Sequence, residues 1–536
     1  MIRRAWLPLS IVALAAALRL WGIEQSLPFV NGRPDEREAL ARMAGFPSGD
    51  LNPHWFVYPN LFFWTIWLWD EAVLAVTRLW APAADFATLL GSDLPRLILY
   101  GRILSALAGT ATVALTYAVA ARAAGRTAGA IAALVVATNV LHVRDTHAMK
   151  SESFLALGTL ACVALLGRWS TSRTGRDAFV AGAAIGVTTA FKYTAILLLV
   201  PAWLLDLRAR SGSLLRRAMP SGMLAGLCAT ALGTFLAASP FLVLDYPNVV
   251  AEGRLYARAV YESRPHAHGP APSTILSAAE WLRTRAFGYH VAVSLRRGCG
   301  LVLTVLVPFA VVTALRRGTP VLWTAAAYVV VHYLAIGASP VMLARYLTPI
   351  VPLLAILVAW LVVDLLGRIH TPALRAAATL TATLLLVGEP ARASVFYDRI
   401  AAETDTRVLA TRWMEANLPP GAVVARLGSF IFPIADPDLP AGATAAALPW
   451  GDTNLDGHGV THVVTHQHLL PFSQLVPQQW NAIAPRLRLL AEFSPYLGRP
   501  GGGFEREDAY YVPMWDGAAV VRPGPLVRVW AVEPAP

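Results

Sequence analysis

Residues 345–366 read RYLTPIVPLLAILVAWLVVDLL, a stretch with few charged side chains. A helix needs roughly 20 apolar residues to cross a bilayer, so this stretch predicts a membrane-spanning helix. The composition agrees, because 56% of the 536 residues are hydrophobic and only 14% are charged, against about 25% charged in an average soluble domain. The high apolar content also excludes intrinsic disorder. We therefore expect a membrane protein.

Further apolar stretches of similar length are separated by short polar segments. With residues 345–366 they predict an α-helical polytopic membrane protein with about eleven transmembrane helices. The other ten stretches lie at residues 6–23, 97–121, 127–142, 151–167, 178–191, 193–207, 219–242, 298–315, 319–338 and 374–390.

The placement of charge predicts the orientation. The net charge is +11, yet residues 391–536 hold eleven arginines and fourteen acidic residues, so the positive excess precedes them. With the N-terminus in the cytoplasm, every arginine cluster between spans except Arg296/Arg297 falls on the cytoplasmic side. That exception lies at the outer end of a helix and leaves open a role in ligand binding. We found no solvated basic face, so no nucleic-acid partner is expected.

Two outer segments are expected to fold outside the spans. Tyr58–Trp80 is rich in tryptophan and phenylalanine and predicts a juxtamembrane helix at the interface. In the tail, a helical pattern at about 399–417 is followed by strand-like runs at Ala422–Ala425, Thr461–Thr465 and Val527–Val532. The prediction is a membrane domain, residues 1–390, and a mixed α/β extracytoplasmic domain, residues 391–536.

Metal and disulfide chemistry have little support in the sequence. The three cysteines have no metal-like spacing and imply no disulfide framework. His266/His268, and His462 with His466 and His468, could gather on a metal, since His466 and His468 would share a strand face. No carboxylate or cysteine joins them at a recognised spacing, so solvated loop histidines are the favoured interpretation. No cofactor is assigned, and a divalent metal is left open.

The Arg33-Pro-Asp35-Glu36 motif follows the first span. Proline at a first helical position followed by acidic residues is a common helix start, which gives a purely structural interpretation. The pair nevertheless lies in the first outer loop, and Leu51-Asn-Pro-His54-Trp-Phe-Val-Tyr58-Pro59 follows it. This setting favours a functional role.

These motifs, in this order, resemble those of the GT-C membrane glycosyltransferases. Within that class the chain is similar to glycosyltransferase family 39, the protein O-mannosyltransferase and aminoarabinose transferase relatives. The family more often has aspartate where Glu152 stands. Further matching motifs are Arg102-Ile-Leu-Ser-Ala-Leu-Ala-Gly, Arg144-Asp-Thr-His147 with Glu152, Thr188-Thr-Ala-Phe-Lys192-Tyr-Thr, Ser239-Pro-Phe-Leu-Val-Leu-Asp245-Tyr-Pro and Arg345-Tyr-Leu-Thr-Pro-Ile-Val-Pro.

The resemblance implies a polyprenyl-phosphate sugar donor and an acceptor hydroxyl or phosphate, with Asp35 of the Asp35-Glu36 pair as catalytic base. Glycosyl transfer between alcohols requires an acid for the leaving oxygen and a base for the attacking one. A phosphate leaves as a stable anion, so one carboxylate suffices if cations stabilise the departing charge.

Candidate cations lie on the predicted outer face. Lys150 and Lys192 are the chain's only lysines. Lys192 interrupts an apolar run, where an uncompensated charge is costly, and Arg345 stands at the mouth of a span. Arg102 is a weaker candidate because it could simply cap a helix, and a lysine near a helix end often only snorkels.

The remaining substrate-binding candidates are His54, Tyr58, His147 and Glu152. For the two histidines a structural hydrogen bond is an equal alternative. We expect a hexosyl- or pentosyltransferase of the bacterial inner membrane that acts with membrane lipids on a glycan, lipid or protein acceptor. A transporter or flippase for a lipid-linked saccharide is the alternative. Transporters place ionisable groups near the membrane midplane and often contain inverted repeats. This alternative is disfavoured because the charged candidates of this sequence lie at the predicted outer face and its two halves do not match.

Overall fold

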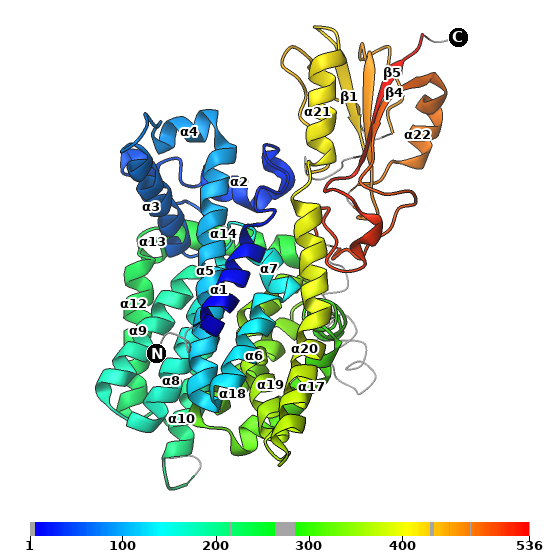
Figure 1. Cartoon of the computed structure of the whole chain (residues 1–536). Coiled ribbons are helices and arrows are strands. Elements are labelled where there is room, and N and C mark those ends of the chain that lie inside the picture. The colour runs from blue at the N-terminus through cyan, green and yellow to red at the C-terminus, as the bar shows by residue number, and fades with distance from the viewer. Residues whose placement is uncertain are drawn as a thin grey trace, which may run out of the picture. The chain divides into compact units, whose positions relative to one another are not determined.

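The computed structural model describes residues 6–213, 217–262, 285–428, 434–449, 451–471, 473–506 and 508–534 (Figure 1). Contacts divide the chain into two compact units. The first comprises the residues up to Leu20, Ala39–Ser92 and Tyr100–Ser394. The second comprises Trp21–Glu38, Asp93–Leu99 and Val395–Pro536. The expected division into 1–390 and 391–536 stays a prediction.

The first unit is helical, and each of the eleven predicted spans contains helix. The helices here and at the unit's borders are α1 (Trp6–Leu20), α2 (Pro34–Ala41), α3 (Asn60–Thr77), α4 (Phe86–Ser92), α5 (Leu94–Ala124), α6 (Arg126–Ala137), α7 (Val140–Thr146), α8 (Ser151–Ser172), α9 (Gly175–Phe191), η4 (Tyr193–Leu198), α10 (Leu199–Ala209), α12 (Gly222–Ala238), α13 (Phe241–Leu244), α14 (Tyr246–Glu262), α16 (Phe287–Tyr289), η6 (His290–Leu295), α17 (Leu301–Arg317), α18 (Pro320–Gly337), η7 (Ala344–Ile350), α19 (Val351–Leu366) and α20 (Pro372–Ala401).

Four helical segments in the described chain are long and apolar enough to cross a membrane: α5, α8, α18 and the continuous Ala344–Leu366. A fifth span results if α6 and α7, bent by 58° at a short break, count as one. The protein is therefore a mostly helical membrane protein, and the number of eleven spans stays a prediction. Tyr58–Trp80 does contain a helix, α3, and its interfacial location likewise stays a prediction.

Small residues allow the helices of the first unit to approach closely. A Cβ added at Gly182 of α9 would lie 2.4 Å from the carbonyl oxygen of Leu227 on α12, and Gly186 meets Ala231 in the same way. Glycine at such contacts lets backbones pack without side chains between them. The helix α8 packs against both α9 and α18. These contacts fix the ends of α8 and α9, where the candidate site lies.

The second unit contains a five-stranded mixed sheet. The strands, β1 (Val423–Leu427), β2 (Thr444–Ala446), β3 (His462–Gln467), β4 (Leu487–Phe493) and β5 (Leu526–Val532), lie in the order β2-β1-β3-β5-β4. β1 is parallel to β2 and β3, with Val424 opposite His462. β5 is antiparallel to β3 and β4, with Val464 opposite Val529.

Alternate residues of the sheet build two cores. Val424, Val464 and Val529 pack with Met414 of α21 (Thr406–Asn417). Their neighbours in the strands pack on Ile483 of α22 (Pro477–Ile483), so the two helices cover opposite faces (Figure 1). The period of two along a strand explains this division. The predicted mixed α/β character of the tail is confirmed.

Details of the tail differ from the prediction. The expected helix at about 399–417 consists of two helices, because α20 ends at Ala401 and α21 starts at Thr406. Asp405 separates them, and its side chain caps α21 by accepting a hydrogen bond from the backbone N–H of Arg407 at 2.9 Å. The three predicted strands are present within one or two residues, while β2, β4 and α22 were missed. β2 has only three residues, and Arg488 and Glu492 break the apolar pattern of β4.

Candidate functional site

Glu152 lies at the start of α8. Lys150 occupies the N-cap in extended conformation, and Glu152 is the acidic residue of the first turn. A carboxylate is favoured there by the helix dipole. Its side chain is only 1% exposed. A charge this deeply buried requires a partner.

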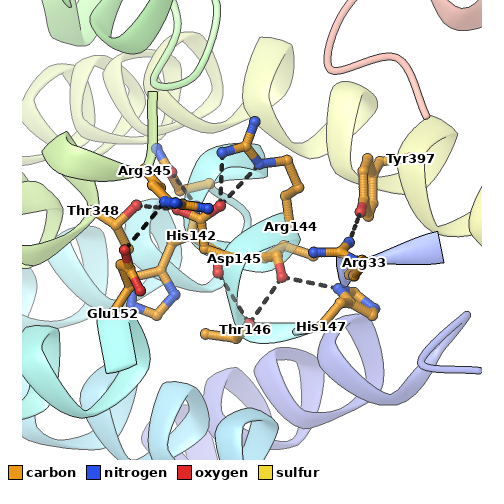
Figure 2. Close-up of polar contacts among 12 residues, drawn as sticks. Arg33, His142, Arg144, Asp145, Thr146, His147, Glu152, Arg345, Thr348 and Tyr397 are labelled. Carbon is orange, nitrogen blue, oxygen red and sulfur yellow. Dashed lines mark hydrogen bonds and ion pairs between the residues drawn. The ribbon is translucent and has the colours of Figure 1, made fainter. Parts of the chain in front are cut away.

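Two cations from other elements supply that partner. α9 ends at Phe191, where the backbone of Lys192 becomes extended before η4 begins. Lys192 Nζ lies 2.5 Å from Glu152 Oε1. Arg345 Nε, on η7, lies 3.4 Å from the same oxygen (Figure 2). One carboxylate oxygen therefore faces two positive groups. Three segments far apart in the sequence meet at this ion cluster, Glu152–Lys192–Arg345.

Aromatic rings enclose the ammonium group. Lys192 Nζ lies 5.7 Å from the ring centroid of Tyr58 and 5.4 Å from that of Tyr346. Both distances fall within cation–π range. The backbone carbonyl of Tyr346 in turn lies 2.8 Å from His332 Nε2, on α18. His332 thus ties η7, which carries Arg345 and Tyr346, to α18.

The ion cluster lines a cavity of about 340 Å³ within the first unit. Glu152, Lys192 and Arg345 are its charged residues, and the remainder is mostly tyrosines and aliphatic side chains. The lining residues are Val57, Glu152, Leu155, Lys192, Tyr193, Thr194, Leu197, Tyr256, His332, Ala335, Ile336, Ser339, Arg345, Tyr346 and Pro349. A cavity that combines converging polar groups with apolar walls is typical of a ligand site.

A second buried ion pair supports η7 from α7. Arg144 Nε donates to Asp145 Oδ1 at 2.9 Å, and both side chains are almost fully buried. Thr348, on η7, donates its hydroxyl to the other carboxylate oxygen of Asp145 (Figure 2). Asp145 therefore pairs with Arg144 and also anchors η7, the segment that carries Arg345.

His54 lies in a polar loop of the first unit. Asn52 donates to Asp245 Oδ2 at 2.8 Å, and His54 Nδ1 lies 3.6 Å from the same oxygen. His54 Nε2 also lies 2.9 Å from Asp50 Oδ2. The hydrogen bond with His54 lowers the pKa of the Asp50 carboxyl. His54 is more than half exposed and acts here as a link between Asp50 and Asp245.

Apart from His54, the predicted site residues fall into three groups. Glu152, Lys192 and Arg345 meet at the cavity, with Tyr58 beside the lysine. Lys150 is buried two residues before Glu152. His147 and Arg102 are buried outside the cavity lining, and the His147 ring makes a structural contact, with Nδ1 2.9 Å from the carbonyl of Val143.

Asp35 and Glu36 form the third group. They begin α2 and belong by contacts to the second unit. Glu36 is fully buried and Asp35 is partly exposed. Before them, Arg33 donates to Gln25 and to the hydroxyl of Tyr397, each at 2.8 Å. The catalytic role assigned to Asp35 stays a prediction.

Comparisons with known proteins identify the architecture. Residues 83–241 match the family model described as dolichyl-phosphate-mannose-protein mannosyltransferase. The oligosaccharyltransferase of Archaeoglobus fulgidus, solved with a tethered acceptor peptide, superposes with a TM-score of 0.50 at 10% identity, covering 86% of this chain and 69% of that chain. The chain carries a GT-C glycosyltransferase fold.

A second solved structure gives a weaker superposition. ArnT from Cupriavidus metallidurans, bound to undecaprenyl phosphate, matches with a TM-score of 0.47 at 15% identity, covering 97% of both chains. No curated protein matches the sequence significantly. The family match at residues 83–241 spans α8, α9 and Lys192, and so contains two members of the ion cluster.

The histidines do not assemble a metal site in the described residues. His266 and His268 lie outside those residues. The interpretation of His466 and His468 as solvated loop residues is wrong, because both are buried. His466 Nδ1 contacts Ser473 Oγ at 2.7 Å, and His468 stacks on Tyr496. They also do not share a strand face, since β3 ends at Gln467.

Sequence reasoning missed His332, Tyr346 and Asp145. A signal existed for His332, because an ionisable residue inside an apolar span indicates a functional position. Tyr346 follows Arg345 directly but carries no charge. Asp145 was quoted within a motif, yet its partner Thr348 is 203 residues away and could not be inferred from the sequence. Arg296, noted as an exception, forms an ion pair with Glu389.

Proposed function

We propose that this GT-C protein is a bacterial inner-membrane glycosyltransferase. It moves a hexose or pentose from a polyprenyl-phosphate donor to an acceptor hydroxyl or phosphate at the outer face of the membrane. The observation that carries the proposal is the cavity in which Lys192 and Arg345 both face Glu152. The family match supports the donor class, because that family is named for a sugar carried on dolichyl phosphate.

The cavity suits a lipid phosphate in charge and in polarity. The phosphate would lie against Lys192 and Arg345, which in a low-dielectric site stabilise a departing charge more strongly than they would in water. The apolar residues Leu155, Leu197 and Ile336 would contact the first part of the polyprenyl chain. The rings of Tyr58 and Tyr346 both lie within cation–π distance of the ammonium group.

The reaction needs one base and no protein acid. The bond between the anomeric carbon and the phosphate oxygen breaks, and the electron pair stays on that oxygen. The acceptor oxygen bonds to the anomeric carbon and gives its proton to Asp35. The leaving phosphate requires no proton because the cations balance its charge.

The proposed orientation places the N-terminus in the cytoplasm and the tail outside, as the arginine clusters predict. Ala441 lies in an exposed turn of the tail. Ala441→Cys, in a chain whose three native cysteines are replaced, should react with a membrane-impermeant thiol reagent on intact spheroplasts. Reaction only after permeabilisation would place the tail in the cytoplasm and contradict the proposal.

The direct test of function combines an assay of a deletion strain with an assay of the purified full-length protein. Mass spectrometry of lipids and envelope glycans from the deletion strain should show one sugar missing from its acceptor. Purified protein with the corresponding polyprenyl-phosphate sugar should restore that modification in proteoliposomes. Movement of the intact donor lipid across the bilayer without sugar transfer would contradict the proposal and favour the transporter.

A further inference from the structure

The ion cluster contains a carboxylate that a simple anion-binding site would not need. Glu152 is 1% exposed, and its Oε1 lies 2.5 Å from Lys192 and 3.4 Å from Arg345, the two groups best placed to receive a phosphate. Among the residues that line the cavity, Glu152 is the one carboxylate, and Lys192 and Arg345 are the two permanent cations. His332 is the one other lining residue that ionises near neutral pH. The carboxylate therefore removes half of the positive charge that the two cations offer.

The proposed reaction changes the charge that the lipid phosphate carries. The donor is a phosphodiester with one negative charge, whereas the spent carrier is a monoester with about −1.5 to −2 at pH 7. A cavity with two uncompensated cations would bind the product more tightly than the donor. Each turnover would then leave the protein occupied by its own product.

We propose that Glu152 is a specificity-determining residue that makes the cavity discriminate against the dianionic spent carrier in favour of the monoanionic donor. This inference rests on the proposed function. A fixed negative charge repels a ligand in proportion to the ligand's own charge. Glu152 therefore raises the free energy of the bound monoester about twice as much as that of the bound diester.

The position of Glu152 makes the repulsion effective. Its burial keeps water from screening the charge, because Glu152, at the start of α8, lies against Lys192, between α9 and η4, and against Arg345 on η7. Lys150, two residues earlier on the N-cap of α8, also acts on it electrostatically. The neighbouring Arg144–Asp145 pair is neutral as a unit and leaves the balance unchanged.

The test measures binding of two short lipids to the full-length protein in detergent at pH 8. Farnesyl phosphate represents the monoester and methyl farnesyl phosphate represents the diester. Glu152→Gln keeps the side-chain size and removes the charge. If the diester then binds about tenfold more tightly, the monoester should bind roughly a hundredfold more tightly, because the Coulomb energy scales with the ligand charge.

Two further variants make the result specific. Glu152→Asp keeps the charge and should preserve the wild-type ratio of the two affinities. Glu389→Gln removes an exposed carboxylate from the same unit and should change neither affinity. An unchanged ratio in Glu152→Gln, or weaker binding of both lipids, would overturn the inference and make Glu152 a scaffold for Lys192.

The same measurement separates this inference from the proposed function. Suppose that Lys192→Ala abolishes binding of both lipids while Glu152→Gln leaves the ratio of the two affinities unchanged. This result would support the proposed donor site and reject the proposed role of Glu152 in selectivity. Failure of the wild-type protein to bind either lipid would reject both.

Discussion

The two units each contain a buried ion cluster, and the clusters differ in what surrounds them. In the second unit Arg407 and Asp405 are both fully enclosed, with 2.5 Å between Nη2 and Oδ2. Ser26 donates to Asp405 Oδ2, and the rings of Phe29 and Tyr511 lie 4.4 and 4.8 Å from the guanidinium carbon. Every face of this pair is covered by protein.

The ion cluster of the first unit is open on one side. Lys192 and Arg345 are 15% and 12% exposed, and both face the 340 Å³ cavity. Paired buried charges cost free energy in either place. The enclosed pair can only hold elements together, whereas the open one can exchange its partner for a ligand. Accessibility, more than charge or burial alone, therefore distinguishes a structural ion cluster from a candidate binding site.

The largest effect is expected at Asp35, the acidic residue of the second unit that is predicted to act in catalysis. Asp35→Asn keeps the side-chain size and removes its basicity, so transfer should fall by about 10²–10⁴-fold, the usual contribution of a general base. Single-turnover transfer by purified protein measures it. Arg33 and Glu36 stay in place, so expression and membrane insertion should be normal. Wild-type turnover would show that Asp35 is not the catalytic base.

Arg407→Met tests the enclosed pair. It leaves Asp405 buried without its cation, which should destabilise the protein by about 3–5 kcal/mol. Thermal unfolding of the detergent-solubilised chain reports the change. Arg345→Met is the matched substitution in the first unit and should cost clearly less, because Glu152 keeps Lys192. Equal losses in both variants would remove the distinction between the clusters.

His468, a buried residue of the second unit, should make the stability of the protein depend on pH. Burial, with the nearby charge of Arg407, lowers its pKa to about 3. The folded state therefore favours neutral imidazole, and stability is complete above the unfolded pKa of about 6.5. As the pH falls from there towards 3, stability should drop by at most about 1.4 kcal/mol per pH unit. Denaturant titrations at pH 4–7.5 should show this slope, and His468→Phe should flatten it. The same slope in the variant would assign the acid sensitivity to other groups.

The sequence was informative where local rules decide the structure. Apolar stretches predicted the helices, and the helical pattern at about 399–417 predicted the end of α21 at Asn417. The grouping of Trp21–Glu38 with the tail could not be predicted, because it depends on contacts such as Ser26–Asp405 across 379 residues. Lys192, Arg345 and Glu152 were each identified as candidates from charge and motif. Their meeting at one oxygen is a tertiary result that no spacing encodes.

The central claim is that the open ion cluster binds the donor phosphate. Equilibrium binding of methyl farnesyl phosphate, the phosphodiester analogue of the donor, to the full-length protein tests it most directly, with Lys192→Ala and Arg345→Ala compared with wild type. Arg317→Ala is the control, since it removes one exposed charge from the same unit. We predict at least about tenfold weaker binding in each cavity variant, equivalent to about 1.4 kcal/mol, and no change in the control. Wild-type affinity in both Lys192→Ala and Arg345→Ala would contradict the account.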